Sequence, residues 1–195
     1  MPLSSYSLDN FVAPKLSLLT TCGMPPLRFP EIPLAAVISD RIVLRRVEPR
    51  QIRLLTNALR WIDAAFTGYS GAQESLIAYS SVQRGKLTDY YMAVLRIEQC
   101  LAATDHAGVL ARKLSGLNYE PSPAKYCLRK LYETSKHVDE RIDKGELPDD
   151  STIPIWLTNA GIESNDHSLS FTELAGFMEH FVGLVRREFG PHETA

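Results

Sequence analysis

The sequence predicts an all-α protein, in which a helical bundle of five to six helices spans residues 49–195. After Pro49 the apolar residues recur at steps of three and four, the spacing of one helix face. Residues 1–49 contain seven of the twelve prolines, and proline blocks regular helix. Residues 1–48 are therefore expected to form a Pro-rich N-terminal arm.

The arm contains one stretch with strand character. "LAAVISDRIVLRRV", residues 34–47, has two short β-type runs around the turn-forming pair Ser39-Asp40, so a short β-hairpin fits there. Two strands alone are marginally stable in water. Such a hairpin would need to lie against the helical body or against a second subunit.

The first half of the bundle is predicted as helices separated by glycine. An apolar stripe over residues 52–69 is expected to end at the glycines of "TGYSGAQES". Ser70 with Gln73 then has the capping-box spacing that starts a second helix. A third helix begins near Thr88, and the Thr-Asp pair at 104–105 is expected to restart the chain as a further helix.

The clearest start signal is Ser122 as N-cap followed by Pro123 at the first helical position. Apolar steps of four and three then predict one helix that ends at Gly145. Its inward seam comprises Ala124, Leu128, Leu131, Ser135, Val138 and Ile142. This is the pattern of one member of an antiparallel bundle.

The C-terminal part is predicted to pack down on the bundle and to end in a helix. Any β-structure outside the arm is expected around residues 153–157, and Ser170 with Glu173 forms a second capping box. The expected core of the whole protein comprises Leu55, Leu59, Ile62, Val94, Leu101, Leu128, Leu131, Val138, Phe177 and Phe181.

Composition gives no reason to expect a membrane, a cofactor or a metal. The formal net charge is -2. Three cysteines without close spacing favour a reducing compartment, and no apolar run is long enough to span a bilayer. "NDHSLSFTEL" matches only the rear half of an EF-hand loop, since Ile162 and His167 stand where aspartate and glycine are needed. We expect a cytoplasmic protein without a cofactor.

The stretch "LYETSKHVDER" carries the candidate chemistry. On one helix, Arg129, Glu133, His137 and Arg141 form a row at four-residue steps, and a solvated face is laced with opposite charges in this way. The alternative is a catalytic set. His137 would be a base near neutral pH, Glu133 would orient it, and Arg129 would hold a phosphate.

This charged helix, followed by a loop and a capped terminal helix, resembles the HEPN superfamily of helical domains. The resemblance covers roughly residues 70–190. It implies a metal-independent RNase that uses an arginine and a histidine of one helix, here Arg129 and His137, supplied by two subunits. The seven-residue spacer "KLYETSK" is longer than the family's, and "SKHVDER" is similar to catalytically inactive members.

A second candidate surface is the arginine cluster of residues 41–60. It comprises Arg41, Arg45, Arg46, Arg50, Arg53 and Arg60 against the single acidic residue Glu48, whereas residues 133–179 hold eleven acidic and three basic side chains. Such a cluster can bind nucleic acid or a protein partner. A salt-bridged contact with the acidic half, within one chain or across a dimer, explains the same pattern without a ligand.

These observations favour a non-enzymatic intracellular helical-bundle protein that acts as a regulatory or protein-interaction module. We expect a homodimer, with a further protein partner open and nucleic acid less favoured. The alternatives are a HEPN-like metal-independent RNase of the toxin or defence type, and a nucleic-acid-binding protein that uses the arginine cluster.

Overall fold

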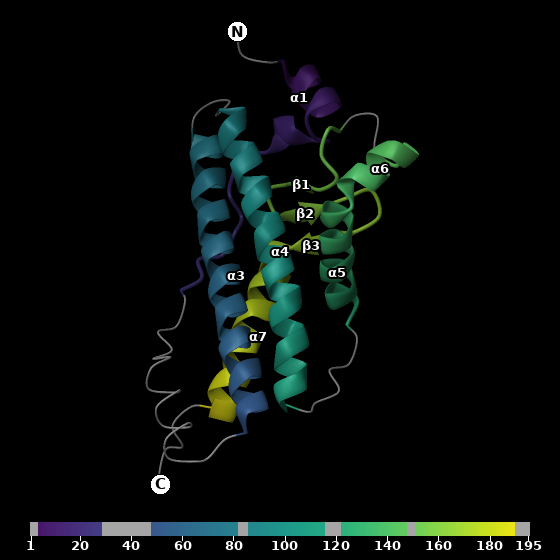
Figure 1. Cartoon of the computed structure of the whole chain (residues 1–195). Coiled ribbons are helices and arrows are strands. Elements are labelled where there is room, and N and C mark those ends of the chain that lie inside the picture. Colours follow the sequence, from purple (N-terminus) through teal and green to yellow (C-terminus); the bar gives the residue numbers. More distant parts are fainter. Residues whose placement is uncertain (1–3, 29–47, 82–85, 116–121, 148–150, 190–195) are drawn as a thin grey trace.

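The computed structural model describes residues 4–28, 48–81, 86–115, 122–147 and 151–189. It is mainly helical, as predicted (Figure 1). Helices α3 (Pro49–Ser81) and α4 (Leu87–Ser115) form a long antiparallel pair, and α7 (Phe171–Phe189) packs against both. The proposed hairpin at residues 34–47 lies outside the described residues.

The core lies between α3, α4 and α7. Nine of the ten residues predicted for it are buried. The tenth, Val138, is only partly buried, for a reason given below. The step of three and four therefore identified the inward faces correctly wherever the helix itself was correctly predicted.

Two predicted helix breaks are absent. Helix α3 runs through Gly68 and Gly71 without interruption, and α4 runs through Thr104 and Asp105. A Cβ atom at Gly68 would lie 3.0 Å from the Arg96 carbonyl oxygen, so this glycine permits close contact between helix backbones. The buried Thr104 hydroxyl donates to the Cys100 carbonyl within its own helix at 2.7 Å. Tertiary packing thus compensates for residues that weaken an isolated helix.

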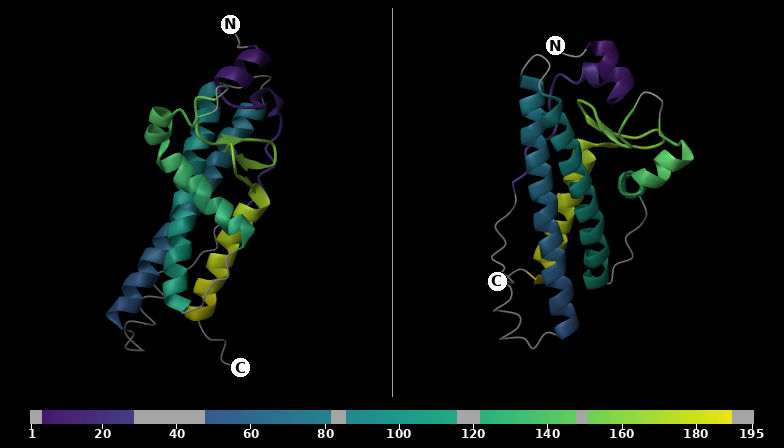
Figure 2. Two further views of the ribbon diagram at one scale, coloured as in Figure 1. Left: turned by 90° about the vertical axis from the view of Figure 1, so that its right-hand side faces the viewer. Right: turned by 45° about the horizontal axis from the view of Figure 1, so that its top comes forward.

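The helix predicted from Ser122 to Gly145 is two helices. Helix α5 (Pro123–Lys136) is capped by the Ser122 side chain as predicted, and α6 (Val138–Lys144) ends at Gly145 in the left-handed conformation. His137 joins them with φ -109° and ψ 38°, outside the helical range. This break turns α6 away from the body (Figure 2), so Val138 leaves the seam and Ile142 is 58% exposed.

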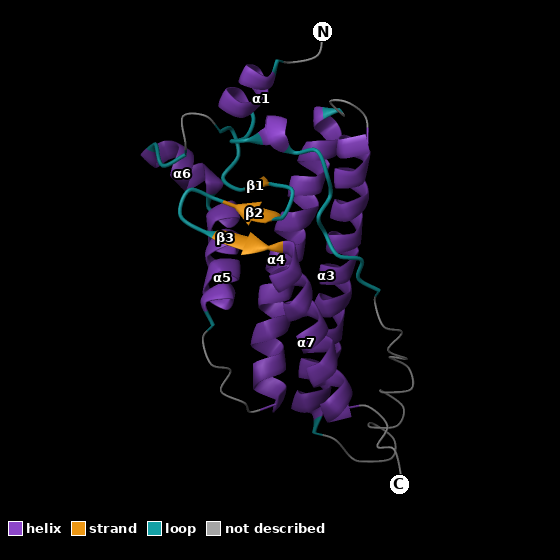
Figure 3. Ribbon diagram, turned by 180° about the vertical axis from the view of Figure 1, so that it is seen from behind, coloured by secondary structure: helices purple, strands orange, loops and turns teal. Residues whose placement is uncertain are grey.

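A small antiparallel sheet precedes the last helix (Figure 3). Its strands are β1 (Trp156–Leu157), β2 (Gly161–Glu163) and β3 (Ser168–Ser170), in that order. Strand structure was predicted only around residues 153–157, the region that contains β1. The capping box of α7 forms as predicted, because Ser170 N donates to Glu173 at 2.9 Å and Glu173 N donates to the Ser170 hydroxyl at 3.1 Å.

Part of the predicted arm belongs to the packed body. Helix α1 (Ser5–Phe11) and the 3-10 turn η1 (Leu16–Leu18) were not predicted, and Leu8 of the first and Leu16 of the second join the core. Asn159 accepts hydrogen bonds from the backbone of Thr20 and Thr21, both at 3.0 Å. The Tyr69 hydroxyl donates to the Pro25 carbonyl at 3.0 Å. Residues 4–28 are thereby held on the bundle.

Candidate functional site

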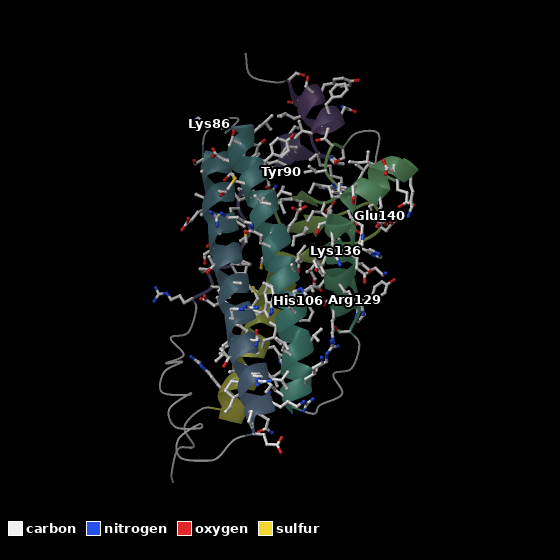
Figure 4. The ribbon with its side chains drawn as sticks, viewed as in Figure 1. Lys86, Tyr90, His106, Arg129, Lys136 and Glu140 are labelled. Atoms are coloured by element: carbon white, nitrogen blue, oxygen red, sulfur yellow. The ribbon has the colours of Figure 1, made fainter. Side chains whose placement is uncertain are left out.

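A groove of about 640 Å³ lies between α4 and α5 and is here called the α4–α5 groove. Helix α4 lines it with Asp105, His106, Val109 and Arg112. The opposite wall comprises Lys125, Tyr126, Arg129, Tyr132, Glu133, Lys136 and His137. Figure 4 marks His106 and Arg129 at a similar height on the two helices, with Lys136 above them.

The three predicted catalytic residues all line this groove, but two of them are paired with each other. Arg129 Nε lies 2.9 Å from Glu133 Oε1, and Lys130 Nζ lies 2.9 Å from Glu133 Oε2. Hydrogen bonds from Lys130 first, and from Arg129, lower the pKa of the Glu133 carboxyl. The Glu133 carboxylate therefore binds Arg129 and Lys130 and makes no described contact with His137.

His137 has a different acidic neighbour from the one predicted. Its Nδ1 atom lies 3.1 Å from Oε1 of Glu140 on α6, and its side chain is 45% exposed. Glu140 in turn lies 3.9 Å from Lys144 Nζ. This is an exposed pair of the kind that the solvated-face interpretation predicts, although it crosses the α5–α6 junction instead of following one helix.

Aromatic side chains also line the groove. The His106 ring is close to two further rings, with centroid distances of 4.7 Å to Trp61 on α3 and 6.0 Å to Tyr132 on α5. The Tyr126 ring is 56% exposed and lies 5.7 Å from Lys130 Nζ. These rings tie three helices together and offer apolar surface beside the charges.

The groove carries more positive than negative charge. It has four lysines or arginines and two carboxylates, with the histidines neutral. The pKa of Lys125 is lowered by burial and by the neighbouring Arg112 guanidinium, with Asp105 acting in the opposite direction. Because Lys125 and Arg112 come from facing helices and repel one another, an anionic group between them would be stabilised.

Sequence reasoning missed the residues that α4 contributes. Asp105, Val109 and Arg112 follow at steps of four and three and hence share one face of a continuous helix. Because a new helix was predicted to begin at residues 104–105, these positions were not recognised as one face of a continuous helix. Lys125 and Tyr126 belong to the first turns of α5 and carry no motif. Only the packing of α4 against α5 identifies them as neighbours.

The arginine cluster is only partly described. Arg41, Arg45 and Arg46 lie outside the described residues. Arg50 and Arg53 are exposed near the start of α3, and the Arg60 guanidinium lies 5.3 Å from the Trp61 ring centroid. Within the described ranges, none of the ion pairs joins these arginines to the acidic half. The predicted arm-to-acid contact stays a prediction.

Within the described residues, no three histidine, cysteine or acidic side chains are placed to hold a metal ion. No described helix combines the length and the apolar character needed to cross a bilayer. Comparisons of the chain with protein-family models, with curated proteins and with solved structures gave no match.

Proposed function

We propose that this protein is a non-enzymatic regulatory or interaction module, and that it binds a negatively charged partner segment in the α4–α5 groove. The observation that carries the proposal is the facing pair of cations, Arg112 and Lys125, beside exposed Tyr126. Tyrosine and arginine are the residues that contribute most often to binding at protein interfaces. The three cysteines are free thiols, which suits a protein that works inside the cell.

The two carboxylates of the groove favour a protein segment over a polyphosphate chain. Asp105 and Glu133 would repel phosphates, but they can accept hydrogen bonds from peptide N–H groups. The chain as a whole carries a net charge of -2, whereas nucleic-acid-binding domains are commonly basic. A short acidic peptide segment would contact the cations of the groove and would not need a basic surface elsewhere on the protein.

A metal-independent RNase is the second candidate, because Arg129, Glu133 and His137 line one groove. Two features weigh against it. Residues eight positions apart on a helix are separated by a rise of about 12 Å, and Arg129 Nε already binds Glu133. General acid–base catalysis needs the base and the cation within hydrogen-bonding reach of one substrate.

The test is a pair of assays on the full chain. An acidic probe peptide of alternating glutamate and alanine should bind in low salt, and Arg112→Gln with Lys125→Gln should weaken its affinity at least about tenfold. The matched control Lys113→Gln, an exposed change on α4 outside the groove lining, should not. Labelled RNA should stay intact without added metal.

Two results would contradict the proposal. Equal peptide affinity in the groove variant and the control would place binding elsewhere. RNA cleavage that His137→Ala abolishes, with the fold intact by circular dichroism, would establish the second candidate.

A further inference from the structure

The α5 wall of the α4–α5 groove presents cations and an aromatic ring in one row. Four of its residues follow at steps of four, three and four and hence share one face of the helix. They are Lys125, Arg129, Tyr132 and Lys136. The first and the last of them are separated by a rise of about 16 Å. The wall is therefore long enough to contact several residues of a partner chain.

The middle of this wall is electrically neutral and partly aromatic. The Arg129 guanidinium is paired with the Glu133 carboxylate at 2.9 Å. The Tyr132 ring follows one turn later and lies 6.0 Å from the His106 ring. A partner side chain at this level meets an aromatic surface and no uncompensated charge, so an apolar side chain suits the middle of the groove.

One end of the groove has an excess of positive charge. Arg112 on α4 and Lys125 on α5 act on each other there, and Asp105 is the carboxylate that opposes them. Two cations thus stand against one acidic group. A carboxylate from a partner would be attracted to this end.

The other end offers a second cation. Lys136 is exposed there. The carboxylate of Glu140 close to this end is already shared by His137 at 3.1 Å and Lys144 at 3.9 Å. In the part of the chain that the structure describes, neither Lys136 nor Arg112 makes an ion pair. The groove therefore matches a partner with a carboxylate near each end and an apolar residue between.

The size of the groove favours an extended partner segment over a helix. A helix about 10 Å wide and 16 Å long encloses about 1,300 Å³, twice the 640 Å³ of the groove. An extended chain advances about 3.3 Å per residue. Five residue steps of such a chain therefore cover the same 16 Å that separate the two ends.

The two walls also fix which side chains of an extended segment can meet the cations. Arg112 lies on the α4 wall and Lys136 on the α5 wall. Successive side chains of an extended segment point to opposite sides, so carboxylates five positions apart can reach opposite walls. A residue two positions before the second carboxylate points to the same wall about 6.6 Å away, and Tyr132 precedes Lys136 by a rise of about 6 Å.

We infer that the α4–α5 groove binds an extended protein segment with two carboxylates five positions apart and an apolar residue two positions before the second. The first carboxylate contacts Arg112 and Lys125, the apolar side chain packs on Tyr132, and the second carboxylate contacts Lys136. The inference rests on the proposed function, since it specifies the partner of the same groove.

Two blocked hexapeptides of identical composition test the spacing on the full chain in low salt. In Asp-Ala-Ala-Leu-Ala-Asp the aspartates have the inferred spacing. In Ala-Ala-Asp-Leu-Ala-Asp the leucine and the second aspartate are unchanged, but the first aspartate falls about 6.6 Å short of the cations at the far end. By NMR titration the first peptide should bind about three- to fivefold more tightly, the factor that one exposed ion pair supplies.

Variants of the chain assign each carboxylate to its end of the groove. Arg112→Gln with Lys125→Gln should make the two hexapeptides bind equally, because the first aspartate then has no cation to reach. Lys136→Gln should weaken both peptides about three- to fivefold and leave their ratio unchanged. Lys113→Gln, an exposed change outside the groove lining, should alter neither affinity. Circular dichroism checks that each variant is folded.

Equal affinities of the two hexapeptides for the wild-type chain, or a preference that survives Arg112→Gln with Lys125→Gln, would overturn the inference. So would tighter binding of a helical peptide with its aspartates eleven positions apart, or a dimer of the chain that this double variant dissociates, since the groove would then have another occupant.

The outcome for the proposed function is separate. If the alternating glutamate–alanine probe depends on the groove cations while the two hexapeptides bind equally, only the spacing inference fails. If no acidic peptide responds to Arg112→Gln with Lys125→Gln, the proposed function itself is contradicted.

Discussion

The Nδ1 atom of His137 lies 3.1 Å from Oε1 of Glu140, across the junction where α5 ends and α6 begins. Both side chains are substantially exposed. Exposed ion pairs contribute little to stability, commonly between zero and about 1 kcal/mol. His137 also makes no side-chain cap hydrogen bond at the start of α6.

We therefore predict that His137→Ala lowers the free energy of unfolding by less than about 1 kcal/mol. The measurement is a urea titration of the variant beside the wild-type chain. A loss above about 2 kcal/mol would show that the histidine has a structural role at the junction that these contacts do not account for.

Leu131→Ala should be far more damaging. Leu131 is fully buried on α5 within the core, and removal of a leucine side chain from such a site leaves a cavity that costs about 2–5 kcal/mol. Ile77→Ala on α3, where the side chain is 51% exposed, is the control and should cost much less. Similar urea midpoints for the two variants would show that α5 does not pack its Leu131 face against the core.

Two glycines inside helices should respond in opposite directions to alanine. At Gly68 a Cβ atom would meet the backbone of Arg96 at 3.0 Å and of Cys100 at 3.2 Å, so Gly68→Ala should destabilise the protein by about 1–3 kcal/mol through overpacking. At Gly176 nothing lies within 4 Å. Gly176→Ala should stabilise α7 by about 0.5–1 kcal/mol. Thermal unfolding of Gly68→Ala tests the α3–α4 contact, and the same measurement on Gly176→Ala is its control.

Glu98 should make stability depend on pH. Burial raises the pKa of its carboxyl from 4.5 to about 7 in the folded protein. The folded state therefore binds more protons than the unfolded state between these values, so the free energy of unfolding falls as the pH rises through this window. Glu98→Gln cannot ionise at this position, and its stability relative to wild type should rise from pH 4.5 to pH 7. Parallel stability curves would contradict the raised pKa.

The local signals in the sequence were sufficient for much of the fold. Ser122 and the Ser170–Glu173 box mark helix starts that the structure contains, because a cap is made by residues a few positions apart. The apolar steps predicted the buried faces for the same reason, since one helix turn fixes which side chains lie together. The candidate residues Arg129, Glu133 and His137 were also found in this way.

Only the tertiary structure decided which local signals prevailed. Gly68 lies in an unbroken helix because α4 packs closely against it, and a helix is stabilised more by such packing than by propensity. The break at His137 follows an equally good apolar pattern, and it separates Val138 and Ile142 from the seam. Arg112 and Lys125 meet across a groove that no sequence spacing encodes, since side chains on different helices become neighbours only when those helices pack.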